Sequence, residues 1–278
     1  MNQPERRLFL IKELLNEKPE YQDLEIPVGE QAQMELLRSL MNVREPGDLT
    51  SELLEIQDEY LRVRAEEKGI VRLEDIPMIG EMYGASDNAH SDDIAIWQGD
   101  ITRLELDAIV NAANSQMLGC FVPMHTCIDN CIHTYAGMQM RAECAQKMRQ
   151  LRKINGNGYE QPVAVPVITD GYNLPAKKVI HVVGPIVQGH LTKEHEELLA
   201  LCYRSCLDVA EKNNLESIAF CCISTGVFMF PNQRAAEIAV KTVCDWLDET
   251  DTRMKVVFNV FKDMDLQIYK RCFGVDGL

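Results

Sequence analysis

The sequence contains no apolar run of about 18 residues, the length that a membrane-spanning helix needs, so we expect no membrane span. Basic residues are also scarce: 28 Lys and Arg stand against 43 Asp and Glu, which gives a net charge of −15. This balance argues against general binding to nucleic-acid backbones, which requires basic patches. The glycine-rich fingerprints of dinucleotide-binding folds and P-loops are missing as well.

Regular cysteine spacing is a further absence. The ten cysteines among 278 residues do not repeat like a disulfide framework, and no CxxC knuckles of a structural zinc site occur. The pair of HxE and PCxxC motifs that marks a zinc base deaminase is missing too. Charged residues at Lys12, Glu13 and Glu17 interrupt the apolar stretch near the N-terminus, so we predict no signal peptide. These observations favour a protein of the reducing cytoplasm.

The first quarter of the chain differs from the rest. Residues 1–75 hold 10 Lys and Arg and 18 Asp and Glu, so about half of the net charge lies there. Apolar residues recur at helical spacing in two stripes, at Leu8, Ile11 and Leu15 and at Leu53, Ile56, Tyr60 and Val63. Pro4 and Thr50 are helix start signals, and Gly69 is a stop signal. We predict a helical N-terminal extension at 1–75 and a main domain at 76–278. The extension would pack on the main domain, line a substrate groove or recognise a partner protein.

From about residue 94 onwards, short apolar runs alternate with helical patterns. Strands are predicted at 94–98, 108–111, 164–169, 179–183, 217–222 and 255–260. Several are continuous apolar runs, as expected for strands buried on both faces. One helical stripe is formed by Leu198, Cys202, Cys206 and Val209, so these two cysteines are expected to be buried helix residues. A second is formed by Ala236, Val240, Val243 and Leu247. The alternation predicts a three-layer α/β/α sandwich with a mixed or parallel sheet.

The strand at 108–111 leads into the segment Asn-Ala-Ala-Asn, residues 111–114. An α/β protein places ligand chemistry where such a strand ends. Ala112 and Ala113 allow close backbone approach, while Asn111 and Asn114 offer amide donors and acceptors. An Asn-rich strand end that only makes Asx-turns is the structural alternative.

Three residues of the following loop are candidate metal ligands: Cys120, His125 and Cys127. Thiolate and imidazole are the ligands that Zn²⁺ prefers, and three protein ligands with an open fourth position form a catalytic arrangement. The alternative is two ordinary reduced cysteines beside an unrelated histidine.

A helical pattern then begins, with Ile128, Ile132 and Tyr135 on one face. Asp129 follows Thr126 at the spacing of a capping box, in which its carboxylate would serve the first helical turn. Alternatively, Asp129 orients or deprotonates a water or a ribose hydroxyl. His133 lies one turn further on, where we favour a packing or hydrogen-bonding role over metal binding.

Two other loops have the composition of ligand loops. Gly99 permits a turn after the first predicted strand, and Asp100 can accept hydrogen bonds from an amine or a hydroxyl, although Asp is also a common turn residue. Small residues at 224–226 expose successive backbone N–H groups before a helix that starts near Pro231, which suits a phosphate. Phe228 and Phe230 would either stack on a ring or pack in the core.

Five segments, in order, resemble the signature segments of macrodomains: GDIT at 99–102, NAAN at 111–114, IDNCIHTYAG at 128–137, ITDGYNLPAKKVIHVVGP at 168–185 and STGVFMFP at 224–231. The resemblance covers about residues 80–278 and implies a macrodomain fold with a mixed sheet. Most macrodomain hydrolases carry a glycine-rich loop after NAAN. Here GCFVPMHTC stands instead, which resembles the zinc-containing macrodomains among microbial protein-ADP-ribose hydrolases, a subfamily that also has an N-terminal helical extension.

The resemblance implies a role for each candidate residue. Adenine would be held by Asp100 and Ile101, and the distal ribose by Asn114. The diphosphate would be wrapped by Ser224, Thr225, Gly226, Val227 and Phe228. Zn²⁺ would be bound by Cys120, His125 and Cys127 next to that ribose. Asp129 corresponds to an aspartate that glycine-loop relatives use near the same sugar, so Asp129 and Asn114 are the candidate catalytic residues.

These roles predict a zinc-dependent hydrolase that removes mono-ADP-ribose from modified protein side chains, at an N- or O-glycosidic or ester bond. Its partners would be ADP-ribose and mono-ADP-ribosylated protein. The alternatives are a non-catalytic ADP-ribose reader and an O-acetyl-ADP-ribose deacetylase, which would use the same pocket. An acidic protein-interaction module is a further alternative that rests on residues 1–75 alone.

Overall fold

The fold is built on a six-stranded sheet, seen in a computed structural model that describes residues 1–21, 23–83 and 89–275. The strand order is β2-β8-β7-β4-β6-β5. Neighbouring strands run parallel except β5, which is antiparallel to β6, so the sheet is mixed as predicted. The strands are β2 (Ile94–Gln98), β4 (Ala108–Ala113), β5 (Val167–Asp170), β6 (Lys178–Val183), β7 (Ser217–Phe220) and β8 (Lys255–Val260). A separate parallel pair joins β1 (Val71–Arg72) to β3 (Leu104–Glu105).

All six predicted strands of the main sheet are present, and four of them have different bounds. The strand predicted at 108–111 extends to Ala113, and the one predicted at 179–183 begins at Lys178. The strand predicted at 164–169 begins only at Val167, because Ala164 has a left-handed backbone (φ 60°) and Pro166 has no N–H to donate to a ladder. The strand predicted at 217–222 ends at Phe220, where the chain enters the loop that contains residues 224–231. The predictions at 94–98 and 255–260 match the observed strands.

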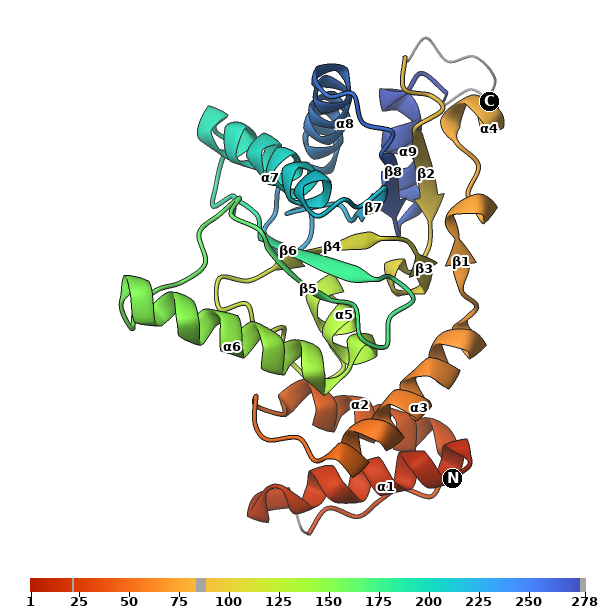
Figure 1. Cartoon of the computed structure of the whole chain (residues 1–278), viewed down its shortest axis with the longest axis vertical. Helices are drawn as coiled ribbons and strands as arrows, with labels where there is room; N and C mark the ends of the chain where they lie inside the picture. The colour runs from red at the N-terminus through yellow and green to blue at the C-terminus, as the bar shows by residue number, and fades with distance from the viewer. Residues whose placement is uncertain (22, 84–88, 276–278) are drawn as a thin grey trace.

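Helices cover both faces of this sheet, which gives the predicted three layers (Figure 1). On one face lie α5 (Ile128–Ala136), which contacts β4, and α6 (Met138–Asn155), which contacts β5. On the other face α7 (Lys193–Lys212) contacts β6 and α8 (Asn232–Glu249), and α9 (Asp263–Cys272) packs beside α8. Cys202 and Cys206 are fully buried on α7, as predicted from their helical spacing.

Three helices form the N-terminal segment, at the bottom of Figure 1: α1 (Gln3–Asn16), α2 (Glu30–Val43) and α3 (Ser51–Lys68). Helices α2 and α3 contact α5, and α1 packs on α2 and α3. The start and stop signals hold, since Pro4 lies in the first turn of α1, Thr50 caps α3 through its side chain, and Gly69 ends α3 at φ 80°. These helices share an apolar cluster that also takes in Met138 of α6. The helical extension is therefore present and packs on the main domain, while the boundary between 75 and 76 stays a prediction.

Shorter elements connect the extension to the sheet. The connection contains the 3₁₀ turn η2 (Leu73–Asp75) and the short helix α4 (Ile79–Tyr83), and further 3₁₀ turns occur at η1 (Pro19–Tyr21) and η3 (Ile101–Arg103). Within the described part of the chain, no helix combines the length and the apolar character that crossing a bilayer demands.

Candidate functional site

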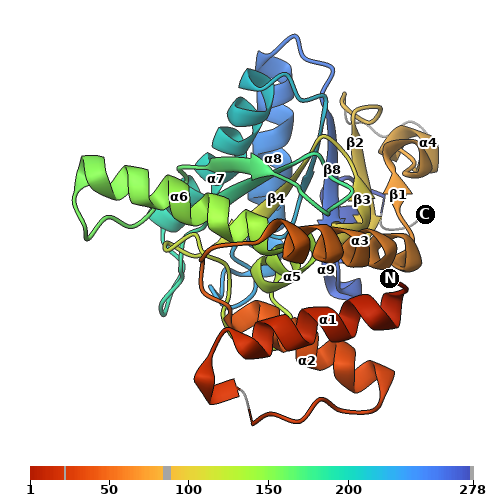
Figure 2. The same cartoon turned by 60° about the horizontal axis from the view of Figure 1, so that its bottom comes forward.

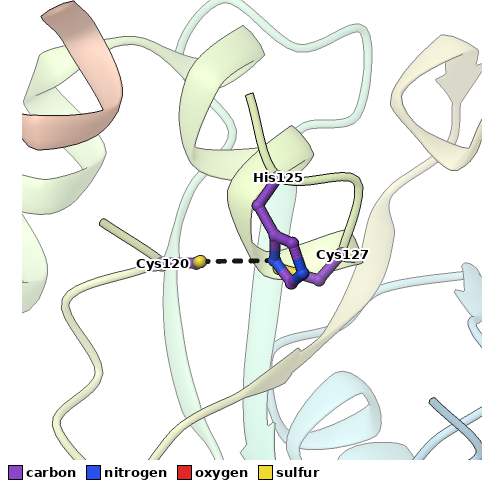
Figure 3. A group of neighbouring side chains, drawn as sticks. All are labelled: Cys120, His125 and Cys127. Atoms are coloured by element: carbon purple, nitrogen blue, oxygen red, sulfur yellow. Dashed lines mark hydrogen bonds between the residues drawn. The ribbon is translucent and has the colours of Figure 1, made fainter. Parts of the chain in front are cut away.

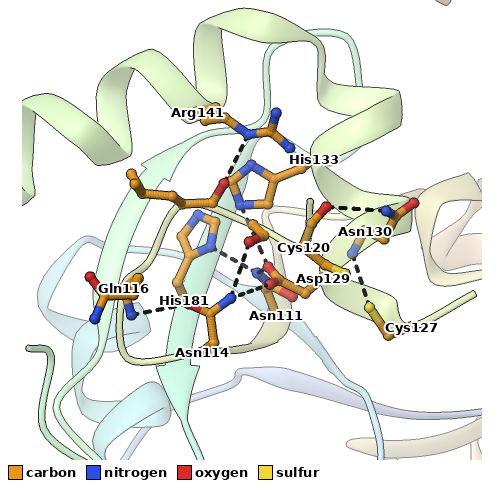
Figure 4. A network of polar contacts seen from close by, with 12 residues as sticks. Asn111, Asn114, Gln116, Cys120, Cys127, Asp129, Asn130, His133, Arg141 and His181 are labelled. Carbon is orange, nitrogen blue, oxygen red and sulfur yellow. Dashed lines mark hydrogen bonds and ion pairs between the residues drawn. The ribbon is translucent and has the colours of Figure 1, made fainter. Parts of the chain in front are cut away.

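The carboxyl end of β4 and the start of α5 meet in a buried cluster of two amides and a carboxylate (Figure 4). Asn111 Nδ2 donates to Asp129 Oδ1 at 2.8 Å, and Asn114 Nδ2 donates to Asp129 Oδ2 at 3.1 Å. Asn114 Nδ2 also reaches the carbonyl of Gly119 at 3.1 Å, which ties the strand end to the next loop. Each oxygen of the carboxylate is thus held by an amide, and the structure brings both candidate catalytic residues, Asp129 and Asn114, together.

Burial governs the protonation of this carboxyl. Asp129 is 5 % exposed. Burial raises the pKa of Asp129 to about 6, and the amide donors of Asn111 and Asn114 and the positive charge of Arg141 offset this rise only in part. A carboxylate with a raised pKa in a fixed position is suited to accept a proton near neutral pH.

The predicted capping box at Thr126 is wrong. The N-cap of α5 is Cys127, whose backbone is extended (φ −67°, ψ 154°) and whose Sγ accepts a hydrogen bond from Asn130 N at 3.4 Å. The helix therefore begins one residue later than the box requires. Because Cys127 serves the helix end, the carboxylate of Asp129 is not used as a cap and instead accepts the two amide hydrogen bonds.

The three candidate metal ligands converge on one another (Figure 3), and Figure 4 shows two of them, Cys120 and Cys127, near Asp129. Sγ of Cys120 and Nδ1 of His125 are 3.5 Å apart, and one ligand atom each from Cys120, His125 and Cys127 lies within 4.8 Å of the others. All three side chains are partly buried. Two sulfurs and one imidazole at this separation fit the number and kind of donors that Zn²⁺ takes in a catalytic site.

A second group of possible ligands, His133, Cys144 and His181, lies behind Asp129 and is fully buried. Nδ1 of His181 is 3.0 Å from Asn111 Nδ2 and its Nε2 is 2.9 Å from Thr169 Oγ1, so both ring nitrogens already have partners. The His133 and His181 rings contact each other, with centroids 5.7 Å apart. Burial lowers the pKa of His133 well below its ordinary value, so its 3.5 Å contact with Asp129 joins a neutral ring to a carboxyl. These positions are consistent with the packing role that we favoured for His133.

Asp100 is engaged by the N-terminal extension, which the sequence did not predict. Its Oδ1 accepts from Thr102 N at 3.0 Å and from Thr102 Oγ1 at 2.6 Å, and its Oδ2 pairs with Lys68 Nζ of α3 at 2.6 Å. Burial by itself raises the pKa of Asp100, but the Lys68 ammonium and Thr102 more than offset this and hold that pKa below its ordinary value. The carboxylate is therefore ionised and one-third exposed, while the neighbouring Ile101 side chain is buried in the core.

The loop after β7 exposes a row of backbone donors. In the part of the chain that the structure describes, the N–H groups of Gly226, Val227 and Phe228 donate to no protein acceptor, and the buried Ser224 Oγ has no partner. Ser224 adopts a left-handed backbone (φ 64°), which turns the chain so that these groups follow one another. Phe230 is 1 % exposed and packs in the core, so of the two phenylalanines only Phe228 remains partly exposed to a ligand. The loop ends where α8 begins after Pro231, as predicted.

Comparison with known proteins assigns this arrangement to a family. A family model described as Macro domain matches residues 110–239. A protein of Treponema medium named protein-ADP-ribose hydrolase is 51 % identical over 272 residues, which cover 98 % of this chain and 99 % of that protein. The chain belongs to the macrodomain family. A second relative of the same name, from Staphylococcus aureus strain MSSA476, is 45 % identical over 97 % of this macrodomain protein and 95 % of its own length.

Solved macrodomain structures agree with this assignment. The Trypanosoma brucei macrodomain in complex with ADP-ribose is 28 % identical, covers 85 % of this chain and 95 % of its own, and superposes with a TM-score of 0.63. The Oceanobacillus iheyensis macrodomain with ADP is 37 % identical, covers 68 % of this chain and 94 % of its own, and has a TM-score of 0.58.

Sequence reasoning missed several polar residues around the macrodomain site. His181 lies in the segment VIHVVGP that already carried the resemblance, so its motif was a usable signal. Lys68, Arg38 and Asn42 gave no such signal, because they sit in helices of the extension more than 30 residues away from the groups that they bind.

Proposed function

We propose that this chain is a zinc-dependent hydrolase that removes mono-ADP-ribose from modified side chains of proteins. The observation that carries the proposal is the convergence of Cys120, His125 and Cys127 next to the held carboxylate of Asp129. The near full-length similarity to proteins named protein-ADP-ribose hydrolase supports the same reaction class.

Two portions of ADP-ribose, the diphosphate and the adenine, match two parts of the site. The N–H groups of Gly226, Val227 and Phe228 suit a diphosphate, because successive backbone donors form a concave site for phosphate oxygens. The ionised carboxylate of Asp100 is suited to accept from an exocyclic amine such as that of adenine. The net charge of −15 repels an anionic ligand at long range. The local backbone donors would therefore have to bind the diphosphate against this repulsion.

The distal ribose would then lie at the end of β4. Asn114, which donates to Asp129, would contact its hydroxyls. Asp129, with its raised pKa, would orient a reacting hydroxyl or water and accept its proton. Cys120, His125 and Cys127 would hold Zn²⁺, which supplies Lewis-acid chemistry at an oxygen of this sugar. Asn111 keeps Asp129 in place by donating to its second oxygen.

The test is to replace a ligand and measure metal and turnover separately. Cys127→Ala and His125→Ala should lose bound zinc in metal analysis and lose about 10²-fold or more of the release of ADP-ribose from an ADP-ribosylated protein. Cys272→Ala is the matched control, because this thiol lies on α9, outside the ligand group, and should keep both properties.

The outcomes separate the alternatives. Zinc-free protein that turns over at the native rate would refute zinc dependence. Tight binding of ADP-ribose without any turnover would identify a reader, and release of acetate from O-acetyl-ADP-ribose in place of ADP-ribose from protein would identify a deacetylase. Assays on substrates linked through acidic residues and through serine would define the bond that is cleaved.

A further inference from the structure

The N-terminal extension makes direct polar contacts with the loop that carries the candidate ligands. Helix α2 contacts α5, and it lies beside the residues that precede α5 (Figure 2). Arg38 of α2 donates through Nη2 to the backbone carbonyl of His125 at 2.8 Å and to Asn130 Oδ1 at 3.0 Å. Asn130 in turn donates to the carbonyls of Cys120 at 3.2 Å and Val122 at 3.0 Å. One guanidinium thus fixes the backbone at two of the three ligand positions, directly at His125 and through Asn130 at Cys120.

Asn42, one turn further along α2, holds the middle of the same loop. Its side chain is 1 % exposed. Oδ1 accepts from Met124 N at 3.0 Å, and Nδ2 donates to Thr134 Oγ1 of α5 at 2.8 Å. Met124 has a left-handed backbone (φ 58°), a conformation that costs a non-glycine residue free energy and persists only when the surroundings hold it. Asn42 supplies such a hold immediately before His125.

Arg141 of α6 joins the end of α2 to the beginning of the loop. Its Nε donates to the carbonyl of Leu118 at 2.8 Å, and its Nη1 donates to the carbonyls of Met41 and Asn42 at 3.0 Å each. The same side chain therefore satisfies helix-end carbonyls that would otherwise lack partners and anchors the loop two residues before Cys120.

These contacts matter because the ligand loop has little regular structure of its own. Residues 114–126 contain no helix or strand, and fixing the backbone of each loop residue costs conformational free energy. If the contacts above fix the ligands when the protein folds, this free energy is not lost again when the metal binds, and metal affinity is higher.

We propose that Arg38 and Asn42 are positioning residues for the zinc site. The extension would then contribute to metal affinity by fixing the backbone of the ligand loop. This inference rests on the proposed function, since it requires that Cys120, His125 and Cys127 bind a metal ion. Neither residue supplies a ligand atom; each acts through the backbone on which the ligands stand.

The experiment compares full-length variants of three α2 residues by titration with Co²⁺ and Zn²⁺. Arg38→Ala and Asn42→Ala should weaken metal binding, measured against a chelator, by about 10- to 100-fold, the usual effect of removing a group that orients a metal ligand. The thiolate-to-cobalt absorption band should weaken or shift in both. Gln33→Ala is the matched control, because Gln33 is also buried on α2, but among the described residues its side chain bonds to Arg7 and the Pro27 carbonyl, both inside the extension.

Conservative variants keep the test valid if an alanine variant folds poorly. Asn42→Asp retains the acceptor for Met124 N and should recover most of the metal affinity, and Arg38→Lys should recover part of it. Equal metal affinity in all variants and the parent would overturn the inference while leaving the zinc site intact. An equal loss in Gln33→Ala would overturn it as well, since a general loosening of the extension would then be the cause. A parent protein that binds neither metal would refute the proposed function itself.

Discussion

At the scale of single residues, the site tolerates no side chain at Gly119, because the backbone there packs against His133. Gly119 lies in the ligand loop directly before Cys120 and has φ +79°, and a Cβ there would lie 2.7 Å from Cγ of His133. His133 is itself buried next to Asp129. Because residue 119 has no side chain, the loop can pack directly against His133, which contacts Asp129.

This geometry predicts that Gly119→Ala destabilises the protein more than an equivalent change elsewhere. Gly156→Ala is the matched control, because Gly156 also has positive φ (+102°) but no atom of the described residues lies within 4 Å of the place where an alanine methyl would stand. The control should lose about 1–3 kcal/mol of unfolding free energy through backbone strain alone. Gly119→Ala should lose a further 1–3 kcal/mol, roughly, through the clash with His133. Urea unfolding of both variants measures the difference, and equal losses would contradict this account.

At the scale of elements, strand β6 carries a buried histidine between the sheet and the site. His181 is fully buried, and its ring nitrogens contact Asn111 of β4 and Thr169 of β5, so it links three strands. Burial lowers the pKa of His181 to about 3, and a nearby Lys147 charge adds to this. The ring is therefore neutral in the folded protein at all physiological pH values.

The buried histidine predicts loss of stability on acidification. An unfolded chain binds a proton at this histidine below about pH 6.5, whereas the folded chain does so only near pH 3. The contribution of His181 to the free energy of unfolding is thus fully present above pH 6.5. It falls as the pH decreases, by up to about 1.4 kcal/mol per pH unit. Urea unfolding at several pH values between about 7.5 and 5 should show a shallower pH dependence for His181→Gln than for the parent. His190→Gln, at an exposed histidine, should retain the parent's dependence, and an unchanged slope in His181→Gln would reject the explanation.

At the scale of the whole molecule, the extension and the sheet share buried interactions. Met138 of α6 packs in the apolar cluster of the extension, and its N–H donates to Gln57 Oε1 of α3 at 2.8 Å. Lys68 of α3 pairs with Asp100 beside the sheet, and Asn42 of α2 reaches Thr134 of α5. Separating the extension from the sheet would break these hydrogen bonds and expose the apolar cluster around Met138 to water, which costs free energy.

We therefore expect the extension and the sheet to unfold in one transition. Both tryptophans, Trp97 and Trp246, lie outside the extension, so their fluorescence reports on the sheet and its helices. Far-UV circular dichroism reports on all helices, including α1, α2 and α3. Urea titrations followed by the two signals should share one midpoint. A separate, earlier change in circular dichroism would show that the extension unfolds independently.

The sequence by itself determined the six strands of the main sheet and the helices α1, α3, α5, α7 and α8, because these leave periodic apolar patterns in neighbouring residues. Helices α2, α6 and α9 were not predicted. It also determined which loops bear ligand-type residues: residues 99–102, 111–114, 120–127 and 224–231 follow predicted strands or precede predicted helices, and the structure brings them to one end of the sheet. A match of local motifs in the right order was enough to predict the macrodomain fold.

Only the tertiary structure decided which partners these residues find. The pairing of Asn111 with His181, of Asp100 with Lys68, and of Arg38 with the backbone of His125 joins segments that no local pattern relates. The cap at Cys127 in place of Thr126 likewise followed from the path of the ligand loop. The physical reason is that backbone propensity acts between neighbours, whereas buried hydrogen bonds are chosen by whichever donors and acceptors the packed helices bring within reach.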